Sequence, residues 1–480
     1  MDWLQAPDYW LTREVLQTGL ALTYLVAFLV AVNQFRPLLG DHGLMPVPRF
    51  LRHVRFMDAP SLFHLGYSDR RLLAVAWSGV ALSIAVLAGV PAFGPPWVAI
   101  VVWLLLWVLY QSIVNVGQVF YGFGWETLLL EAGFLAIFLG AGPTAPMLPL
   151  IYLYRWLVFR VEFGAGLIKL RGDRCWRELT CLYYHHETQP MPNPLSWFFH
   201  HLPKPLHRVE VVGNFFAQVV VPWFLFAPQP VASVAAAVVV LTQGWLVLSG
   251  NFSWLNFLTM TLAVSAFDDR ALSLVLHVQP PHLAPLPLWW QAAAVAVTLL
   301  VLFLSYRPVR NLISPRQVMN SSFDPFHLVN TYGAFGSVTK VRFEIAIEGS
   351  SEGGGDWKEY EFKGKPTRVD RAPLQFAPYH LRLDWLMWFA AMEPAYANPW
   401  LIAFLVRLLQ GDRATLRLLR GSPFPNRPPA EVRATLYRYR FSTPAELRRD
   451  HVWWVRDRVG EYLPPIRLDA TGGPVRAVHE

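Results

Sequence analysis

Residues 154–201 decide how this chain is organised, and they read YRWLVFRVEFGAGLIKLRGDRCWRELTCLYYHHETQPMPNPLSWFFHH. The first part is an apolar run that nevertheless contains four ionisable side chains: Arg155, Arg160, Glu162 and Lys169. A charge inside an apolar span is costly, so it usually faces the interior of a helix bundle or a water-filled cavity. The second part is polar and rich in His and Pro, which is typical of a connecting loop.

The chain as a whole has the composition of a multi-pass membrane protein. Of its 480 residues 54% are hydrophobic, and many apolar runs approach the length of about 20 residues that crosses a bilayer. We therefore expect an α-helical polytopic bundle with about 8–9 hydrophobic spans. The candidate runs are 15–32, 72–90, 97–116, 125–139, 148–170, 211–226, 231–248, 251–267 and 288–305.

A change in composition near residue 306 predicts two domains. We expect a transmembrane helical domain over 1–305 and a soluble α+β domain over 306–480. In the second domain, apolar and charged residues alternate over 341–348 and 359–363, which predicts a β-hairpin. Segments 382–392 and 399–411 look helical. The sequence Thr-Pro-Ala-Glu at 443–446 predicts a capping box, and we expect its helix to run on to Pro464.

The distribution of charge bears on the partners of the protein. The net charge is +8, and the excess of positive charge lies in the tail after residue 306. Nucleic-acid binding would need a denser basic surface, so we expect no nucleic-acid partner. A basic domain beside a bilayer is more often in contact with lipid headgroups or with an acidic protein.

The ionisable residues of the apolar runs form a predicted intramembrane network. Glu126 and Glu131 are further carboxylates in such a run, and they would either pair with Arg155 or Arg160 or form a catalytic dyad. The predicted network therefore contains Glu126, Glu131, Arg155, Arg160, Glu162 and Lys169.

Glu162 and Lys169 are seven residues apart, so they share one helix face about two turns apart. In one interpretation they are the candidate catalytic residues, with Lys169 as a base. In the other they are structural: Glu162 pairs with an Arg of a neighbouring helix, and Lys169 extends toward the membrane edge.

Cys175 and Cys181 are the two cysteines of the chain, and their spacing is not that of a Cys-x-x-Cys redox site. The residues leave three interpretations open: a local disulfide, two unpaired packing cysteines, or an exchange-active thiol.

A cluster of His residues follows the cysteines, at His185, His186, His200, His201 and His207. Two of these pairs are adjacent in sequence, and neighbouring side chains rarely point at one metal ion. We therefore predict no metal site here. Because no phosphate-binding, nucleophile-elbow, zinc-protease or dinucleotide motif stands in a supportive context, we also predict no cofactor.

Four stretches of this sequence resemble the lipase maturation factor family, in that family's order. They are RWLVFRVEFGAGLIKLRGDRCWRELTCLYYHHETQPMPNPLSWFFHHLP (155–203), GFGWETLLLEAGFLAIFLG (122–140), LVNTYGAFGSVTKVRFEIAIEG (328–349) and PYHLRLDWLMWFAAM (378–392). The resemblance covers most of the chain. It implies a multi-pass protein of the endoplasmic reticulum membrane, or of the inner membrane if the source is bacterial.

Members of that family promote the folding and assembly of secreted lipases into active homodimers. The resemblance therefore implies a chaperone-like maturation factor with a secreted, lipase-like client, rather than an enzyme. Cys175 and Cys181 match the family's G-D-x-C-W and T-C-L pattern. As candidate client contacts we predict His185, His186, Asn330, Tyr332, Tyr379, Arg382, Asp384 and Trp385.

An alternative function follows from the segment AGLIKL at 165–170. It is similar to a stretch of the vitamin K-dependent γ-carboxylase, in which a lysine of a similar motif serves as the base. By this resemblance the protein would be a membrane enzyme that uses Lys169 as a base in a lipid- or quinone-linked reaction.

With nine spans, three regions would lie on one side of the membrane: 33–71, 171–208 and everything after 307. These regions contain the Arg-rich loops, so the positive-inside rule would make that side cytoplasmic. The family resemblance instead implies the lumenal side. We follow the resemblance, because a factor that matures secreted proteins must meet them there.

Overall fold

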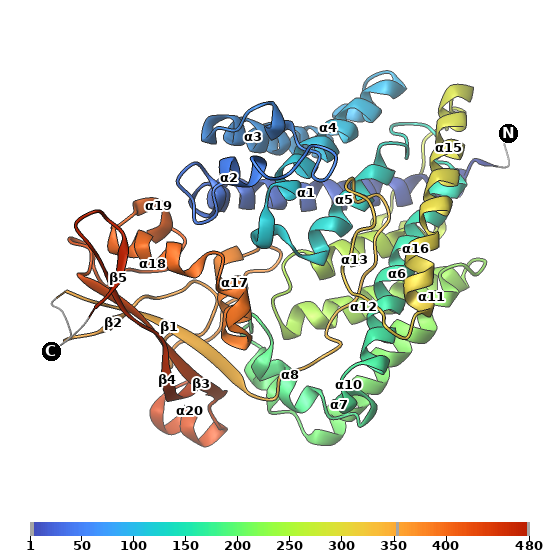
Figure 1. The fold of residues 1–480 in the computed structure, drawn as a ribbon. Coiled ribbons are helices and arrows are strands. Elements are labelled where there is room, and N and C mark those ends of the chain that lie inside the picture. The colour runs from blue at the N-terminus through green and yellow to red at the C-terminus, as the bar shows by residue number, and fades with distance from the viewer. Residues whose placement is uncertain (1–3, 352–354, 478–480) are drawn as a thin grey trace.

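The computed structural model describes residues 4–351 and 355–477, and it places a helical body first and a β-sheet last (Figure 1). All nine apolar runs predicted from the sequence are helical. They form α1 (Trp10–Leu39), α3 (Asp69–Leu87), α4 (Pro96–Asn115), α5 (Gly124–Ala136), α6 (Leu148–Arg171), α10 (Lys204–Phe215) with α11 (Val221–Phe224), α12 (Val231–Ser249), α13 (Leu255–Ala263) and α15 (Leu288–Leu304).

Shorter helices connect or extend these elements. They are α2 (Val47–Leu51), α7 (Arg174–Arg177), α8 (Leu182–Thr188), α9 (Ser196–His200), α14 (Asp269–Leu276) and α16 (Tyr306–Ile313). Local sequence explains where the main helices begin. Ser68 caps α3 by accepting a hydrogen bond from the Arg71 amide, and Pro96 occupies the first turn of α4, where a missing N–H costs nothing.

Five helices of the described chain are long and apolar enough to cross a membrane. They are Pro7–Leu39, Asp69–Leu87, Pro96–Asn115, Val231–Ser249 and Leu288–Ile313. The expected count of 8–9 spans is therefore not confirmed. Helix α5 has only 13 residues, and α6 has 24 residues but contains five charged side chains. The apolar helices nevertheless make this an integral membrane protein.

Helix α1 has 30 residues and extends about 45 Å, so its start and its end lie at opposite ends of the helical body. At its start, the Trp10 indole donates a hydrogen bond to the Gly142 carbonyl (2.9 Å). Thr144 in turn forms a β-bridge with Ala284, so the loops before α6 and before α15 lie at this end. At its far end, the Gln34 amide donates to the His380 carbonyl of the tail (2.7 Å).

Of the three regions expected on one side of the membrane, the tail contacts the other two. Besides the contact of Gln34 with the tail, the Trp197 indole of α9 donates to the Ser442 carbonyl (2.8 Å). The Arg342 guanidinium also donates to the Pro190 carbonyl (3.1 Å). The tail therefore contacts both the end of α1 and the α7–α9 connector.

The tail contains a five-stranded antiparallel sheet in the order β2-β1-β3-β4-β5. The strands are β1 (Arg342–Ser350), β2 (Lys358–Glu359), β3 (Glu431–Phe441), β4 (Trp454–Leu468) and β5 (Pro474–Arg476). The predicted hairpin is present, since Glu348 pairs with Glu359, but β2 has only two residues. The long partner of β1 is β3. Helices α17 (Arg382–Met392) and α18 (Leu401–Leu409) pack against the sheet, and α19 (Arg413–Leu416) follows them.

One expectation about the tail was wrong. The capping box forms as predicted, with the Thr443 side chain and Glu446 bonded reciprocally at the start of α20 (Pro444–Asp450). The helix ends there, however, and Trp454–Leu468 is a strand rather than a continuation of the helix. Pairing of Trp454 with Phe441 of β3 outweighs the local helical pattern. Pro464 and Pro465 lie within β4 at a shift in its register with β3, where a missing N–H is tolerated.

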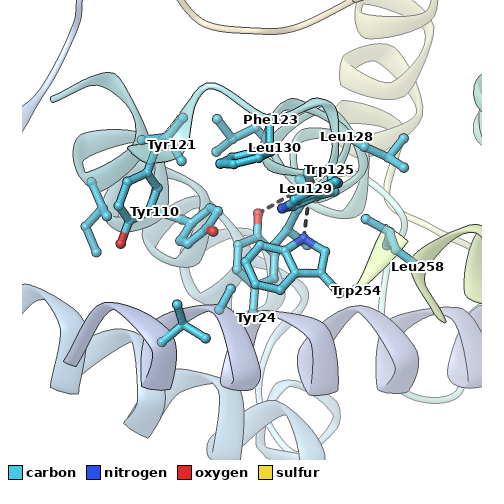
Figure 2. Packing of buried hydrophobic residues seen from close by; sticks show 14 of the residues in the cluster. Tyr24, Tyr110, Tyr121, Phe123, Trp125, Leu128, Leu129, Leu130, Trp254 and Leu258 are labelled. Atoms are coloured by element: carbon cyan, nitrogen blue, oxygen red, sulfur yellow. Dashed lines mark hydrogen bonds between the residues drawn. The ribbon is translucent and has the colours of Figure 1, made fainter. Parts of the chain in front are cut away.

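Aromatic side chains fill the core where α1, α4, α5 and α13 meet (Figure 2). Figure 2 shows the Trp254 indole pointing at the backbone of α5, where it donates to the Trp125 carbonyl (3.1 Å). The Tyr24 hydroxyl donates to the Leu129 carbonyl of the same helix (3.3 Å). Buried indole and phenol groups need such partners, so these bonds fix the position of α5. That helix carries Glu126 and Glu131.

Candidate functional site

The two carboxylates of α5 join the helical body to the tail. The first, Glu126, lies in the opening turn of α5 and is fully buried. Its partner is Arg382 of α17, whose guanidinium lies 2.8 Å from the carboxylate and also donates to the Phe120 carbonyl (2.7 Å). Tyr110 donates a short hydrogen bond to the same carboxylate. The prediction that Glu126 pairs with Arg155 or Arg160 was therefore wrong, because its cation comes from the distant tail.

Glu131 forms the second joint, and here the predicted pairing with Arg160 is present as a buried ion pair. The same carboxylate accepts hydrogen bonds from the tail: from the Asn330 amide (3.0 Å) and from the Tyr332 hydroxyl (2.7 Å). Arg160 also donates to the Asn330 carbonyl (2.7 Å). A buried ion pair needs such additional bonds to offset its desolvation. The segment around Asn330 therefore completes the ion pair.

Two glycines of the FGAG motif allow this close packing. A Cβ atom at Gly164 would collide with the Tyr332 carbonyl of the tail. One at Gly166 would lie 2.7 Å from the Val219 side chain, in the π-helical turn Phe216–Val220 between α10 and α11. Larger residues at either position would push the tail or this turn away from α6.

Glu162 and Lys169 are both buried on α6, but neutral amides rather than charges contact them. The Gln243 amide of α12 donates to Glu162 (2.6 Å), and Gln243 itself accepts from Asn256 (2.7 Å). Lys169 donates to Gln218 (2.7 Å) and to Asn214 (3.0 Å). Neither detail of the structural interpretation holds. Glu162 has an amide partner instead of an Arg, and Lys169 is buried instead of extending to the membrane edge.

Arg155 is the one member of the predicted network that bonds mainly to backbone. Its guanidinium donates to the carbonyls of Ser265 (3.0 Å) and Leu225 (3.1 Å) and to the Tyr9 hydroxyl (2.9 Å). These bonds tie α6 to the ends of α11 and α13. The six ionisable residues therefore divide into two joints with the tail, one amide-lined pair and one structural arginine.

Cys175 and Cys181 form a disulfide in the structure. It lies in a small apolar cluster with Trp176 and Leu182, at the turn between α7 and α8. The Trp176 indole donates to the Phe335 carbonyl (2.8 Å), so the bridged turn also holds the tail segment.

The residues predicted to contact a client lie mostly inside the protein. Only Tyr379 is partly exposed, and its hydroxyl accepts a hydrogen bond from Asn33 (3.3 Å). Buried are His185, His186, Asn330, Tyr332, Arg382, Asp384 and Trp385. Asp384 accepts hydrogen bonds from the amides of Gly364 and Lys365, and burial raises its pKa. In this conformation these side chains are packed inside the chain, and direct client contact stays a prediction.

Several polar residues that complete this site were not predicted from the sequence. The amides of Gln218, Gln243 and Asn256 line α6, and Gln34 and His380 lie beside Arg382. Burial lowers the pKa of His380 to about 3, so it is neutral beside the Glu126–Arg382 pair. A signal was available, because polar amides within apolar helices often bond across helices.

The geometry favours a structural role for most of these charges. Each carboxylate of α5 pairs with a cation and accepts a hydrogen bond from a tyrosine hydroxyl, and both sites include bonds from the membrane helices to the tail. Such an arrangement holds two regions in a fixed relation.

The sequence of this chain is similar to two domain families and to several known proteins. The family described as lipase maturation factor transmembrane domain matches residues 11–274, and the lipase maturation factor C-terminal domain matches residues 328–464. Lipase maturation factor 1 of Homo sapiens is 42% identical over 97% of this chain and 89% of its own length. That of Bos taurus is 42% identical over 98% and 91%.

More distant relatives carry a related name. Lipase maturation factor 2 of Mus musculus is 31% identical over 95% of this chain and 83% of its own length. No solved structure matches the chain. The alternative of a carboxylase-like enzyme finds no support among these relatives.

Proposed function

The chain belongs to the lipase maturation factor family, and from this premise we propose that it assists newly made secreted lipases to reach their active, assembled form. The observation that carries the proposal is similarity at 42% identity over 97% of the chain to a protein named lipase maturation factor 1. The client is thus a lipase, and the compartment is the endoplasmic reticulum, where secreted proteins fold.

The architecture suits this role because the tail is held at a fixed position on the membrane helices. In any other arrangement of the tail, the buried carboxylates Glu126 and Glu131 would lose partners that offset their desolvation. The two joints therefore favour one arrangement of the tail over many. A preorganised surface loses less entropy when it binds a client.

We place the client on the face formed by the α7–α9 connector and the sheet. The connector that contains α7–α9 retains exposed apolar side chains there: Leu195 is 41% and Phe198 51% exposed. Phe198 lies beside Trp453 of the tail, with ring centroids 6.4 Å apart. An exposed apolar patch suits the incompletely buried apolar surface of a folding client.

The function is tested in cells that lack lipase maturation factors and express a secreted lipase. Expression of the wild-type chain is expected to restore lipase activity in the medium, relative to an unrelated multi-pass protein. Phe198→Ser is expected to restore less. Phe93→Ser is the matched control, because Phe93 is 86% exposed at the end of the helical body where α1 begins. Absence of rescue by the wild-type chain would contradict the function. Equal rescue by both variants would contradict only the client face.

The proposed orientation has a separate test. Asp469→Asn creates an Asn-Ala-Thr glycosylation acceptor at the exposed β4–β5 turn. If the tail is lumenal, this variant gains a glycan that an endoglycosidase removes. The control is His277→Asn with Gln279→Thr in the exposed loop after α14, near the start of α1. It should gain no glycan beyond those of the unaltered chain, which has its own Asn-Ser-Ser acceptor at 320–322 in the tail. Glycosylation of the control alone would reverse the proposed orientation.

A further inference from the structure

We infer that His186, His207 and Glu210 form a binding site for a zinc ion at the junction of α8 and α10. One ligand atom from each side chain can be chosen so that all three lie within 4.8 Å of one another. Two imidazoles and a carboxylate are a donor set that zinc takes in proteins.

The strongest observation is the state of His186. Its side chain is only 1% exposed, yet neither ring nitrogen has a hydrogen-bond partner within the described residues. His207 is equally buried, and its Nδ1 also has no partner there. Leaving a buried polar atom unpaired costs about 1–3 kcal/mol, so three such nitrogens at one place need an explanation. A metal ion between them would satisfy one nitrogen of each ring.

The structure also answers the objection that adjacent histidines do not point at one ion. Only His186 of its pair faces α10, where it lies beside His207 with ring centroids 5.7 Å apart. The neighbouring His185 ring instead packs against Phe335, with centroids 4.9 Å apart. His207 and Glu210 are three residues apart on α10, so they project from one helix face.

The third ligand is oriented and accessible. Glu210 accepts a hydrogen bond from the Trp245 indole through Oε1 (2.7 Å), which leaves Oε2 directed at His186 Nε2 at 4.0 Å. Such outer-shell bonds commonly orient metal ligands. The Glu210 side chain is 17% exposed, which gives an ion a path from solvent.

The expected coordination follows from these distances. Zinc–ligand bonds of about 2.0–2.2 Å separate tetrahedral ligand atoms by roughly 3.3 Å, so the ligand atoms must approach one another by at most about 1.5 Å. Rotation of the Glu210 side chain and the two rings supplies this movement. Three protein ligands leave a fourth position for water or for a group from a bound protein. Imidazole donors favour zinc over magnesium or calcium, which prefer oxygen.

The test is zinc binding to the full chain purified in detergent without a histidine tag. After treatment with a chelator and addition of zinc, dialysis and elemental analysis should find about one zinc per chain. His207→Gln and Glu210→Gln should each bind zinc at least 10-fold more weakly. His201→Gln is the control, because it changes a histidine of the same connector whose ring bonds to the Trp197 carbonyl.

A second variant separates loss of the site from loss of the fold. Trp245→Phe keeps all three ligands and removes only the hydrogen bond to Glu210, so zinc binding should weaken by about 10–100-fold. Cobalt(II) bound in place of zinc should show a visible spectrum of low-coordinate geometry in the wild type and lose it in Glu210→Gln. No retained zinc in the wild type would overturn the proposal. Equal retention by Glu210→Gln and His201→Gln would also overturn it.

Discussion

Replacing Arg382 by Met should loosen the tail from the membrane helices. Arg382 is fully buried, and its guanidinium lies 2.8 Å from Glu126 and 3.4 Å from the centre of the Tyr121 ring. Methionine retains the length and apolar contacts of the side chain but removes the charge. Glu126 would then remain buried at the start of α5 without a cation.

The expected magnitude follows from this burial. Breaking a buried pair by removing one partner costs about 3–5 kcal/mol, because an uncompensated charge is left inside. At about 1.4 kcal/mol for each factor of ten, the detached state becomes roughly 100- to 4,000-fold more populated. Adding Glu126→Gln removes the stranded charge. The double variant should therefore recover at least about 1 kcal/mol relative to the sum of the single changes.

The assay is the rate of proteolysis in detergent between α16 and β1, where Arg316 and Lys340 are exposed. Cleavage of a transiently opened segment reports the population of the open state. Arg438→Met is the matched control, because its ion pair with Asp457 is 59% and 60% exposed and should contribute little. The reasoning is refuted if Arg382→Met is cut at the wild-type rate. Strict additivity in the double variant would refute the pairing with Glu126.

Three further predictions concern packing, the disulfide and pH. Gly164→Ala should destabilise the protein by about 1–3 kcal/mol in thermal melts, because its Cβ meets the Tyr332 carbonyl, whereas Gly213→Ala meets no atom within 4 Å and should not. Cys175→Ser with Cys181→Ser should cost about 2 kcal/mol for so short a loop, and reductant should lower the melting temperature of the wild type alone. Burial lowers the pKa of His380 to about 3 in the folded chain, whereas in the unfolded chain it is about 6.5. As the pH falls below about 6.5, the unfolded chain therefore binds a proton that the folded chain does not. Stability should therefore drop by roughly 2 kcal/mol between pH 7 and pH 5, and His380→Gln should flatten this slope, while no change of slope would contradict the assignment.

Much of the architecture was predictable from local sequence. The apolar runs are long and all are helical, although run 211–226 is divided between α10 and α11. The capping box at Thr443 and the strand β1 depend on neighbours a few residues apart, and both were predicted correctly. The expected alternation of burial along β1 was wrong, because Arg342, Glu344 and Glu348 are buried while Phe343 is exposed. The strand β4 was not, because pairing with β3 overrides the helical pattern after Asp450.

The sequence by itself determined that charges would lie among apolar helices, since burial of Glu126, Glu131, Arg160 and Lys169 follows from the runs that contain them. It could not determine their partners. Arg382 lies 256 residues beyond Glu126, and no local periodicity relates two residues at that separation. Only the tertiary structure brings the tail against α5, because a buried carboxylate is stable where packing delivers a cation and donors to it. Likewise, only the tertiary structure shows that His186, and not the adjacent His185, faces α10.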